Sequence, residues 1–393
     1  GPERRAAAGS QRARPAGAMR GLQGSSRSKP LQWNDDSLDE NSLNPMWGSS
    51  SIEASLSVEE EKEPAVVPKE SAAVDIATLA TVRENVDMNM AMDFQGMERL
   101  GAGATAVVYR AVRQDVGQVA LKVLRPDHTD TDLRDVMEEA AILSRIKHDN
   151  IIGFFGMGKS PRPFMVLEYL GAGVLPGALS RAHPYEAALP TLARRRFPFI
   201  KALHVAHSLC SALVYLHEEA FEDSMIIHRD IKPENVGFSY EGRALLLDFG
   251  LATVLRKRST STEAYALTGC TGSTRYMAPE VFLNEPYGES VDVYSLGMVL
   301  WEMCTLVKPF QDMDEHSFST RVVGTGERPP MGPDWPLRLR QAFSEAWDGN
   351  WRQRPRARRL LGWLDELLAE EQRRLEKIAE DAGCGSLGGC LVL

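Results

Sequence analysis

From about residue 93 onward, the chain carries short stretches rich in β-branched and apolar residues. Residues 105–112 and 119–124 are two such stretches, and the polar residues 113–118 between them predict a β-hairpin. Residues 131–146 place Val136, Ala140 and Leu143 at helical spacing, which predicts a helix with one apolar face. Residues 164–169 predict a further apolar strand.

Helical periods dominate after this strand. Residues 199–217 carry one apolar stripe, and residues 291–306 are apolar around most of the circumference, which predicts a buried central helix. Strands followed by helices predict an α+β fold of two lobes with a cleft between them: an N-lobe antiparallel sheet with one main helix, and a mostly helical C-lobe.

The first 92 residues lack a sustained apolar period. Residues 1–30 hold seven Arg or Lys and one Glu, which is typical of a disordered basic arm or, alternatively, a transit peptide. Residues 31–92 are acidic and predict a disordered linker. Because the first residue is not Met, residues 1–18 could be a remnant, a processed end or upstream translation, with Met19 as a candidate start.

Composition narrows the class of protein. Hydrophobic residues make up 43% of the 393 residues and charged residues 25%, which allows a sizeable core. The net charge of −9 argues against a nucleic-acid partner. Five cysteines without CxxC spacing predict reduced thiols, a cytoplasmic setting and no zinc site. No apolar run approaches the ~18 residues of a membrane span.

Two segments carry the chemistry. They are HRDIKPEN at residues 228–235 and DFG at residues 248–250. Together they place an acid, a lysine and an amide on one loop and a second acid on the next, which suits phosphoryl transfer from a metal-bound nucleotide to a hydroxyl. Both segments resemble the catalytic and metal-binding loops of eukaryotic Ser/Thr protein kinases, and the end of the domain resembles their tyrosine-kinase-like subgroup.

The resemblance implies roles for the catalytic loop. Asp230 would accept the proton of the substrate hydroxyl, and Lys232 would neutralise charge on the transferred group. Asn235 and Asp248 would hold Mg²⁺. Lys232 favours Ser/Thr over Tyr acceptors.

The segment LGAGATAVV at residues 100–108 resembles the glycine-rich loop that approaches the ATP phosphates. Ala106 stands where the family has its third glycine, which puts the grip on phosphate in doubt. Lys122 would bind the α- and β-phosphates and pair with Glu139 on the 131–146 helix; Glu138 is the alternative partner. Adenine would lie between apolar side chains and the hinge, with Leu167 closing the back pocket. The other residues implied in nucleotide binding are Gly101, Ala102, Gly103, Val108, Ala120, the Glu168 carbonyl and the Leu170 N–H.

Residues 248–280 would form the activation segment, which ends in GSTRYMAPE. The Ser273 hydroxyl would bridge Asp230 and Lys232. Asp292 would brace the catalytic loop, and Arg354 would pair with Glu280. The kinase domain is therefore predicted over residues 93–368, with residues 174–198 and 218–225 as surface insertions and residues 369–393 as a helical extension and tail.

Regulation is predicted from two further features. Arg229 precedes the catalytic Asp, so it could pair with a phosphate added by an upstream kinase or by self-phosphorylation. The candidate acceptors are Ser259, Thr260, Ser261, Thr262, Thr268 and Thr271; a plain hydroxyl-rich loop is the alternative. The final residues CLVL fit a prenylation motif, with Cys390 as the acceptor for a prenyltransferase and Cys384 as a candidate palmitoylation site, which would attach the protein peripherally to a membrane surface.

The sequence thus predicts an ATP- and Mg²⁺-dependent Ser/Thr protein kinase acting on protein substrates. A membrane-tethered pseudokinase scaffold is the alternative, because Ala106 departs from the family pattern. A small-molecule kinase is a third hypothesis, disfavoured by the peptide-docking segment at residues 272–280.

Overall fold

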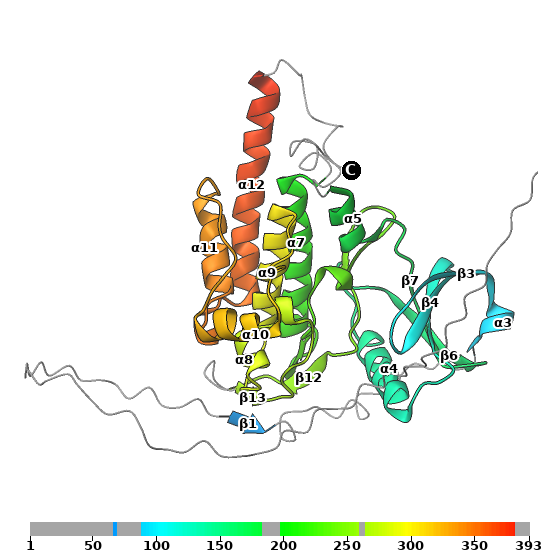
Figure 1. Cartoon of the computed structure of the whole chain (residues 1–393). Coiled ribbons are helices and arrows are strands. Elements are labelled where there is room, and N and C mark those ends of the chain that lie inside the picture. The colour runs from blue at the N-terminus through cyan, green and yellow to red at the C-terminus, as the bar shows by residue number, and fades with distance from the viewer. Residues whose placement is uncertain (1–65, 69–87, 183–196, 259–263, 382–393) are drawn as a thin grey trace, which may run out of the picture. The chain divides into compact units, whose positions relative to one another are not determined.

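The computed structural model describes residues 66–68, 88–182, 197–258 and 264–381 (Figure 1). The chain divides into two units, residues 1–61 and 62–393, and all described residues lie in the second. The basic arm and most of the predicted linker lie outside the described residues.

The first part of the domain is a six-stranded sheet in the order β2-β6-β7-β5-β4-β3. The predicted hairpin is present, with β4 and β5 paired antiparallel. Gly117, the first residue of β5 after the turn, has φ +89°, a backbone conformation that favours glycine. One face of the sheet packs a small core around Phe94, Leu121 and Phe164. The strands and the short adjoining helix are β2 (Met88–Asn89), α3 (Met90–Asp93), β3 (Phe94–Ala102), β4 (Ala106–Arg113), β5 (Gly117–Leu124), β6 (Phe154–Ser160) and β7 (Phe164–Glu168).

One main helix, α4 (Asp130–Leu143), accompanies this sheet. Thr129 and Asp132 form a capping box at its start, which satisfies two backbone N–H groups that have no partner inside the helix. Its buried face includes Val136, Ala140 and Glu139. The helix ends at Leu143 rather than at the predicted residue 146.

The remainder of the domain is mostly helical (Figure 1). Helix α7 (Phe199–Val214) packs against both α9 (Ser290–Thr305) and α12 (Ala357–Asp381). As predicted, α9 is the central helix, because thirteen of its residues are buried, from Val291 to Met303. The other helical segments are α5 (Leu175–Ala182), η3 (Pro233–Asn235), η4 (Thr274–Tyr276), α8 (Pro279–Phe282), α10 (Glu315–Ser317), η5 (Phe318–Gly324), α11 (Leu337–Ala346) and η6 (Trp351–Gln353).

Helix α7 continues as the π-helix η2 (Tyr215–Glu219). Residues Phe199–Glu219 are long and apolar enough for a membrane span by length and composition, contrary to the sequence-based prediction. However, 61% of the most apolar window is buried inside the domain, which is the pattern of a core helix.

Short strands position the catalytic loop. β9 (Ser224–Ile227) pairs with β12 (Thr253–Arg256), and β10 (Val236–Phe238) pairs with β11 (Ala244–Leu246) and with β8 (Gly173–Val174). β1 (Val66–Pro68) pairs with β13 (Ala264–Ala266). The prediction of surface insertions is wrong in part, because Met225 in β9 and Leu175 and Leu179 in α5 are buried. Residues 183–196 lie outside the described part.

Candidate active site

Lys122 lies at the centre of the nucleotide side of the site. Its ammonium Nζ is 2.7 Å from Glu139 Oε2 and 3.1 Å from Asp248 Oδ1. Glu139 is buried, whereas its neighbour Glu138 is exposed, so the helix places the predicted partner and not the alternative against the lysine. Burial alone would lower the pKa of Lys122, but the carboxylates of Glu139 and Asp248 outweigh it and raise the pKa.

The two carboxylates respond differently to this cation. Burial raises the pKa of Glu139 despite the adjacent Lys122, whereas the attraction of Lys122 outweighs burial at Asp248 and lowers its pKa. Asp248 is therefore held as a carboxylate that is half exposed. Phe249, next to it, is buried with its ring 4.9 Å from that of His228.

The catalytic loop gathers its polar groups around Asp230. Lys232 Nζ is 2.6 Å from Asp230 Oδ2, and the Asn235 amide donates to the Asp230 carbonyl oxygen at 2.8 Å and to Oδ2 at 3.0 Å. The Ser273 backbone N–H donates to Asp230 Oδ1 at 3.1 Å. The contact from Ser273 thus comes from its main-chain N–H, whereas the sequence had suggested the hydroxyl.

Asp292 holds the backbone of the catalytic loop in place, as predicted. Its carboxylate accepts from the backbone N–H groups of His228 and Arg229 at 2.9 and 2.8 Å, and it lies 2.9 Å from His217 Nε2. Burial would raise the pKa of Asp292, but the hydrogen bond and charge of His217 outweigh it and lower the pKa. Arg229 needs this support because its φ is +67°. His217 was not predicted; it gave no sequence signal beyond its place in an apolar helix.

Asn235 and Asp248 offer two oxygen ligands for a divalent cation. Asn235 donates its amide hydrogens to Asp230, so its carbonyl oxygen remains to bind a cation together with the Asp248 carboxylate. Among the described residues no group of three or more His, Cys, Asp or Glu could hold a metal. One carboxylate and one amide fit Mg²⁺, which keeps waters and substrate phosphates as its other ligands.

The nucleotide-binding residues predicted from sequence lie on neighbouring strands. Ala120 pairs with Leu167, and Val108 pairs with Lys122, so these residues share one region of the sheet. Gly101 and Ala102 end β3, and the Gly103 N–H donates to the Ala106 carbonyl at 2.8 Å. Ala106 is 5% exposed, so its methyl group is buried and does not face solvent.

At the hinge, Glu168 ends β7 and Leu170 follows it. The Glu168 N–H donates to the Gly153 carbonyl at 2.8 Å. The predicted adenine partners are two other main-chain groups, the Glu168 carbonyl and the Leu170 N–H. Leu167 is buried behind them. Their roles toward adenine stay predictions.

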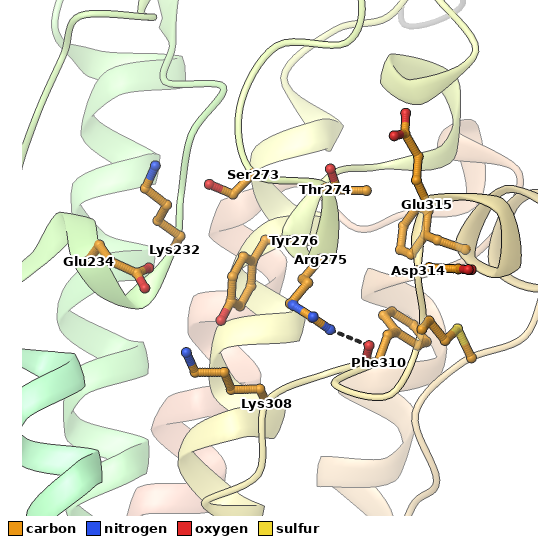
Figure 2. Close-up of a pocket in the computed structure, with 12 residues that line it drawn as sticks. Lys232, Glu234, Ser273, Thr274, Arg275, Tyr276, Lys308, Phe310, Asp314 and Glu315 are labelled. Atoms are coloured by element: carbon orange, nitrogen blue, oxygen red, sulfur yellow. Dashed lines mark hydrogen bonds between the residues drawn. The ribbon is translucent and has the colours of Figure 1, made fainter. Parts of the chain in front are cut away.

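Beside the catalytic loop lies a cavity of about 440 Å³ (Figure 2). Lys232 and Ser273 lie at one end of it, and Asp314 and Glu315 lie at the other. The Arg275 guanidinium is held by the carbonyl oxygens of Pro309 and Phe310. Lys232, which lines the cavity, is 2.6 Å from Asp230, so the cavity lies close enough to take side chains that flank an acceptor hydroxyl.

Tyr276, which lines this cavity, contacts a buried carboxyl group that the sequence did not indicate. The Tyr276 hydroxyl donates to Glu302 Oε2 at 2.6 Å. Burial raises the pKa of Glu302 to about 7, against the hydrogen bond from Tyr276. Glu302 is thus a buried acid that titrates near neutral pH.

The activation segment contacts the catalytic loop through Arg229. Its Nη1 donates to the Thr268 hydroxyl at 3.2 Å, and its Nε donates to the Leu251 carbonyl at 2.6 Å. The Thr271 hydroxyl bonds instead to the Thr268 carbonyl. The candidate acceptors Ser259, Thr260, Ser261 and Thr262 lie outside the described residues, as do Cys384 and Cys390.

Comparison with known proteins agrees with this geometry. Residues 94–361 match the protein kinase domain family. The chain is 31% identical over 280 residues to the serine/threonine/tyrosine-protein kinase HT1 and 32% identical over 299 residues to the serine/threonine-protein kinase VIK, both of Arabidopsis thaliana. It is also 28% identical over 275 residues to mitogen-activated protein kinase kinase kinase 7 of Drosophila melanogaster.

These matches cover 70%, 74% and 70% of this chain, but only 66%, 61% and 37% of the relatives. The chain thus spans less than two thirds of the length of these relatives. The similarity confirms the predicted resemblance to Ser/Thr kinases and is consistent with the tyrosine-kinase-like subgroup. Because the family match covers most of its length and coincides with the site, the chain belongs to the protein kinase domain family.

Proposed function

We propose that this chain phosphorylates Ser and Thr hydroxyls of protein substrates, with ATP as the phosphoryl donor and Mg²⁺ as the metal. The observation that carries the proposal is the arrangement of Asp230, Lys232 and Asn235 on one loop, with Asp248 bound to the Lys122–Glu139 pair. A protein kinase domain uses Mg·ATP, and the bound nucleotide supplies the phosphoryl group.

Each residue has a distinct task in this proposal. Asp230 accepts the hydroxyl proton and orients the attacking oxygen, while Lys232, 2.6 Å from it, offsets negative charge next to the acceptor. Lys122 positions the phosphates, and Glu139 holds Lys122 in place. The Ser/Thr preference is supported by Lys232 and by the names of the relatives.

A nucleotide-binding and phosphorylation assay tests this proposal. Wild-type protein should show a thermal shift with Mg·ATP and phosphorylate a Ser/Thr peptide library. Asp230→Asn should retain the thermal shift but lose at least about a hundredfold in turnover, because only the proton acceptor is changed. Glu366→Gln, on an exposed ion pair with Arg338, is the matched control.

Two outcomes would contradict the proposal. Binding of Mg·ATP without turnover by wild type would instead support the pseudokinase alternative. Turnover that is unchanged by Asp230→Asn would refute the assigned mechanism.

We further propose that phosphorylation of the activation segment, by an upstream kinase or by self-phosphorylation, raises activity. Of the described candidates, Thr268 is supported by its contact with Arg229, whose guanidinium could pair with a phosphate there. Phosphatase treatment should lower the activity of wild type severalfold and leave Thr268→Ala unaffected. Full activity after complete dephosphorylation would refute the regulation.

A third proposal concerns location. The CLVL ending supports prenylation of Cys390 by a prenyltransferase, with Cys384 as a candidate second lipid site, and a cytoplasmic protein held peripherally at a membrane. Cys390→Ser should shift the protein from the membrane to the cytosolic fraction of prenyl-competent cells. Equal partitioning of both proteins would contradict the anchor.

A further inference from the structure

The turn between β10 and β11, residues 239–243, lies against the hinge. It belongs to the C-lobe, yet two of its side chains reach beyond that lobe: Arg243 bonds to Glu168 at the hinge, and Tyr240 bonds to Gln118 on β5. We infer that Tyr240 and Arg243 position the hinge for the nucleotide. This inference rests on the proposed ATP-dependent function and assigns two positioning residues to it.

Arg243 holds the carboxylate of the hinge glutamate. Its Nη2 is 3.0 Å from Glu168 Oε1, and its Nη1 donates to the Asp149 carbonyl at 2.6 Å. The other carboxylate oxygen of Glu168 accepts from the Gly153 N–H at 3.2 Å. One side chain of the hinge is therefore fixed both by the C-lobe guanidinium and by the backbone that leads into β6, so the Glu168 peptide has little freedom to rotate.

Tyr240 covers the outside of the hinge. Its ring centroid is 5.8 Å from that of Tyr169, and its hydroxyl donates to Gln118 Oε1 at 2.6 Å. The side chain is otherwise open to solvent, because the residue is 63% exposed. An exposed tyrosine would ordinarily sample several rotamers, and here a tilted ring contact with Tyr169 and a hydrogen bond to Gln118 select one.

Gly171 leaves room for this tyrosine. A Cβ at position 171 would lie 2.4 Å from both Cγ and Cδ1 of Tyr240, so any larger residue would displace the ring. The backbone of Gly171 does not have the positive φ that would by itself require glycine, in contrast to Gly173 at +80°. The close approach of Tyr240 is therefore the physical reason for glycine at position 171.

The contacts of Tyr240 and Arg243 connect the C-lobe to β5 and to the hinge, next to the place where adenine is predicted to bind. Holding Glu168 and the following residues before the nucleotide arrives lowers the ordering cost of binding. The contacts touch neither the acceptor site nor Asp230. They should therefore affect nucleotide affinity and leave phosphoryl transfer at saturating ATP unchanged.

Binding of Mg·ADP to the full chain, measured by calorimetry, together with KM for ATP and kcat, tests the inference. Tyr240→Phe keeps the ring and loses only the hydroxyl, and Arg243→Gln loses the ion pair. We expect each variant to raise the Kd for Mg·ADP and the KM for ATP about three- to tenfold, with kcat within twofold of wild type. Gln118→Ala combined with Tyr240→Phe should give no larger effect than either change alone, since both remove the same bond.

A suppressor pair separates positioning from general damage to the fold. Gly171→Ala should weaken Mg·ADP binding at least threefold in the presence of Tyr240, and the added methyl should have no further effect in a Tyr240→Ala background. Arg338→Gln, which breaks the exposed ion pair with Glu366, is the control and should leave the KM for ATP unchanged.

The outcomes distinguish this inference from the proposed function. Nucleotide binding unchanged by Tyr240→Phe and Arg243→Gln would overturn the positioning role and leave the kinase proposal intact. A fall in kcat and melting temperature without a change in Kd would also overturn it. A wild-type chain that binds no Mg·ADP would overturn the proposed function and the inference together.

Discussion

Arg354 and Glu280 form a buried bidentate ion pair, with Nη1 2.6 Å from Oε1 and Nη2 2.8 Å from Oε2. The pair ties the end of the activation segment to the residues just before α12, 74 positions later. The guanidinium also lies 4.9 Å from the ring of Tyr294 on α9. Arg354 therefore joins three elements of the C-lobe at a buried position.

Removal of one partner of this pair should destabilise the domain strongly. We expect Glu280→Gln to lower the free energy of unfolding by about 3–5 kcal/mol, because it leaves the buried Arg354 without its counter-charge. Urea denaturation measures the effect. The matched control is Glu219→Gln, which breaks an exposed pair with Arg358 and should cost about 1 kcal/mol or less. Equal losses in the two variants would contradict the assigned burial.

Loss of Lys122 should strongly lower activity. We expect Lys122→Met to lower kcat/KM at least about a hundredfold, because the phosphates lose their positioning cation. Glu139→Gln should cost less, since Lys122 keeps its contact with Asp248. Kinetics with a peptide substrate measures both variants. Glu138→Gln, one residue away and exposed, is the control and should match wild type.

The alanine in place of the third loop glycine should be compatible with activity. Ala106 is 5% exposed and packs inward, so Ala106→Gly should cost about 1 kcal/mol of unfolding free energy and change the KM for ATP less than about threefold. Thermal unfolding and ATP kinetics measure the two effects. A gain of tenfold or more in turnover would show that Ala106 restrains the enzyme, as the pseudokinase alternative requires.

Glu302 should make stability depend on pH around neutrality. Its pKa of about 7 lies above the ordinary 4.5, so the folded protein keeps a proton that the unfolded chain has lost. The contribution of Glu302 to the free energy of unfolding therefore falls by at most about 3 kcal/mol as pH rises from 4.5 to 7. Above pH 7 this contribution stays low.

Denaturation of Glu302→Gln between pH 5 and 8 tests this sign. The variant should lose the decline with pH and exceed wild type in stability at pH 8, because the amide oxygen still accepts from Tyr276 without carrying a charge. Glu366→Gln, at an exposed site, should keep the wild-type slope. A variant whose slope equals that of wild type would show that Glu302 does not titrate in this range.

The catalytic residues could be predicted from sequence because each contributes by its chemical type at a fixed place in a short motif. Asp230, Lys232 and Asn235 lie within one loop, and Glu139 could be told from Glu138 because the helical period turns only one of them toward the apolar face. The Asp292 brace and the Arg354–Glu280 pair followed from the family resemblance.

Contacts between distant segments gave no such local signal. Sequence suggested the hydroxyl of Ser273 as the contact to Asp230, but in the folded chain the main-chain N–H of Ser273 makes that contact. In the sequence, His217 is one polar residue in an apolar helix. Only the fold brings its Nε2 to 2.9 Å from Asp292 Oδ2.

The local alternation of apolar and polar residues and the identity of the reactive groups were thus determined by the sequence alone, since both depend on near neighbours in the chain. The pKa of Glu302, the burial of α7 and the contacts of Tyr240 and Arg243 with the hinge were decided only by the tertiary structure. The physical reason is that desolvation and long-range hydrogen bonds depend on which segments pack together, and no short window of residues contains that information.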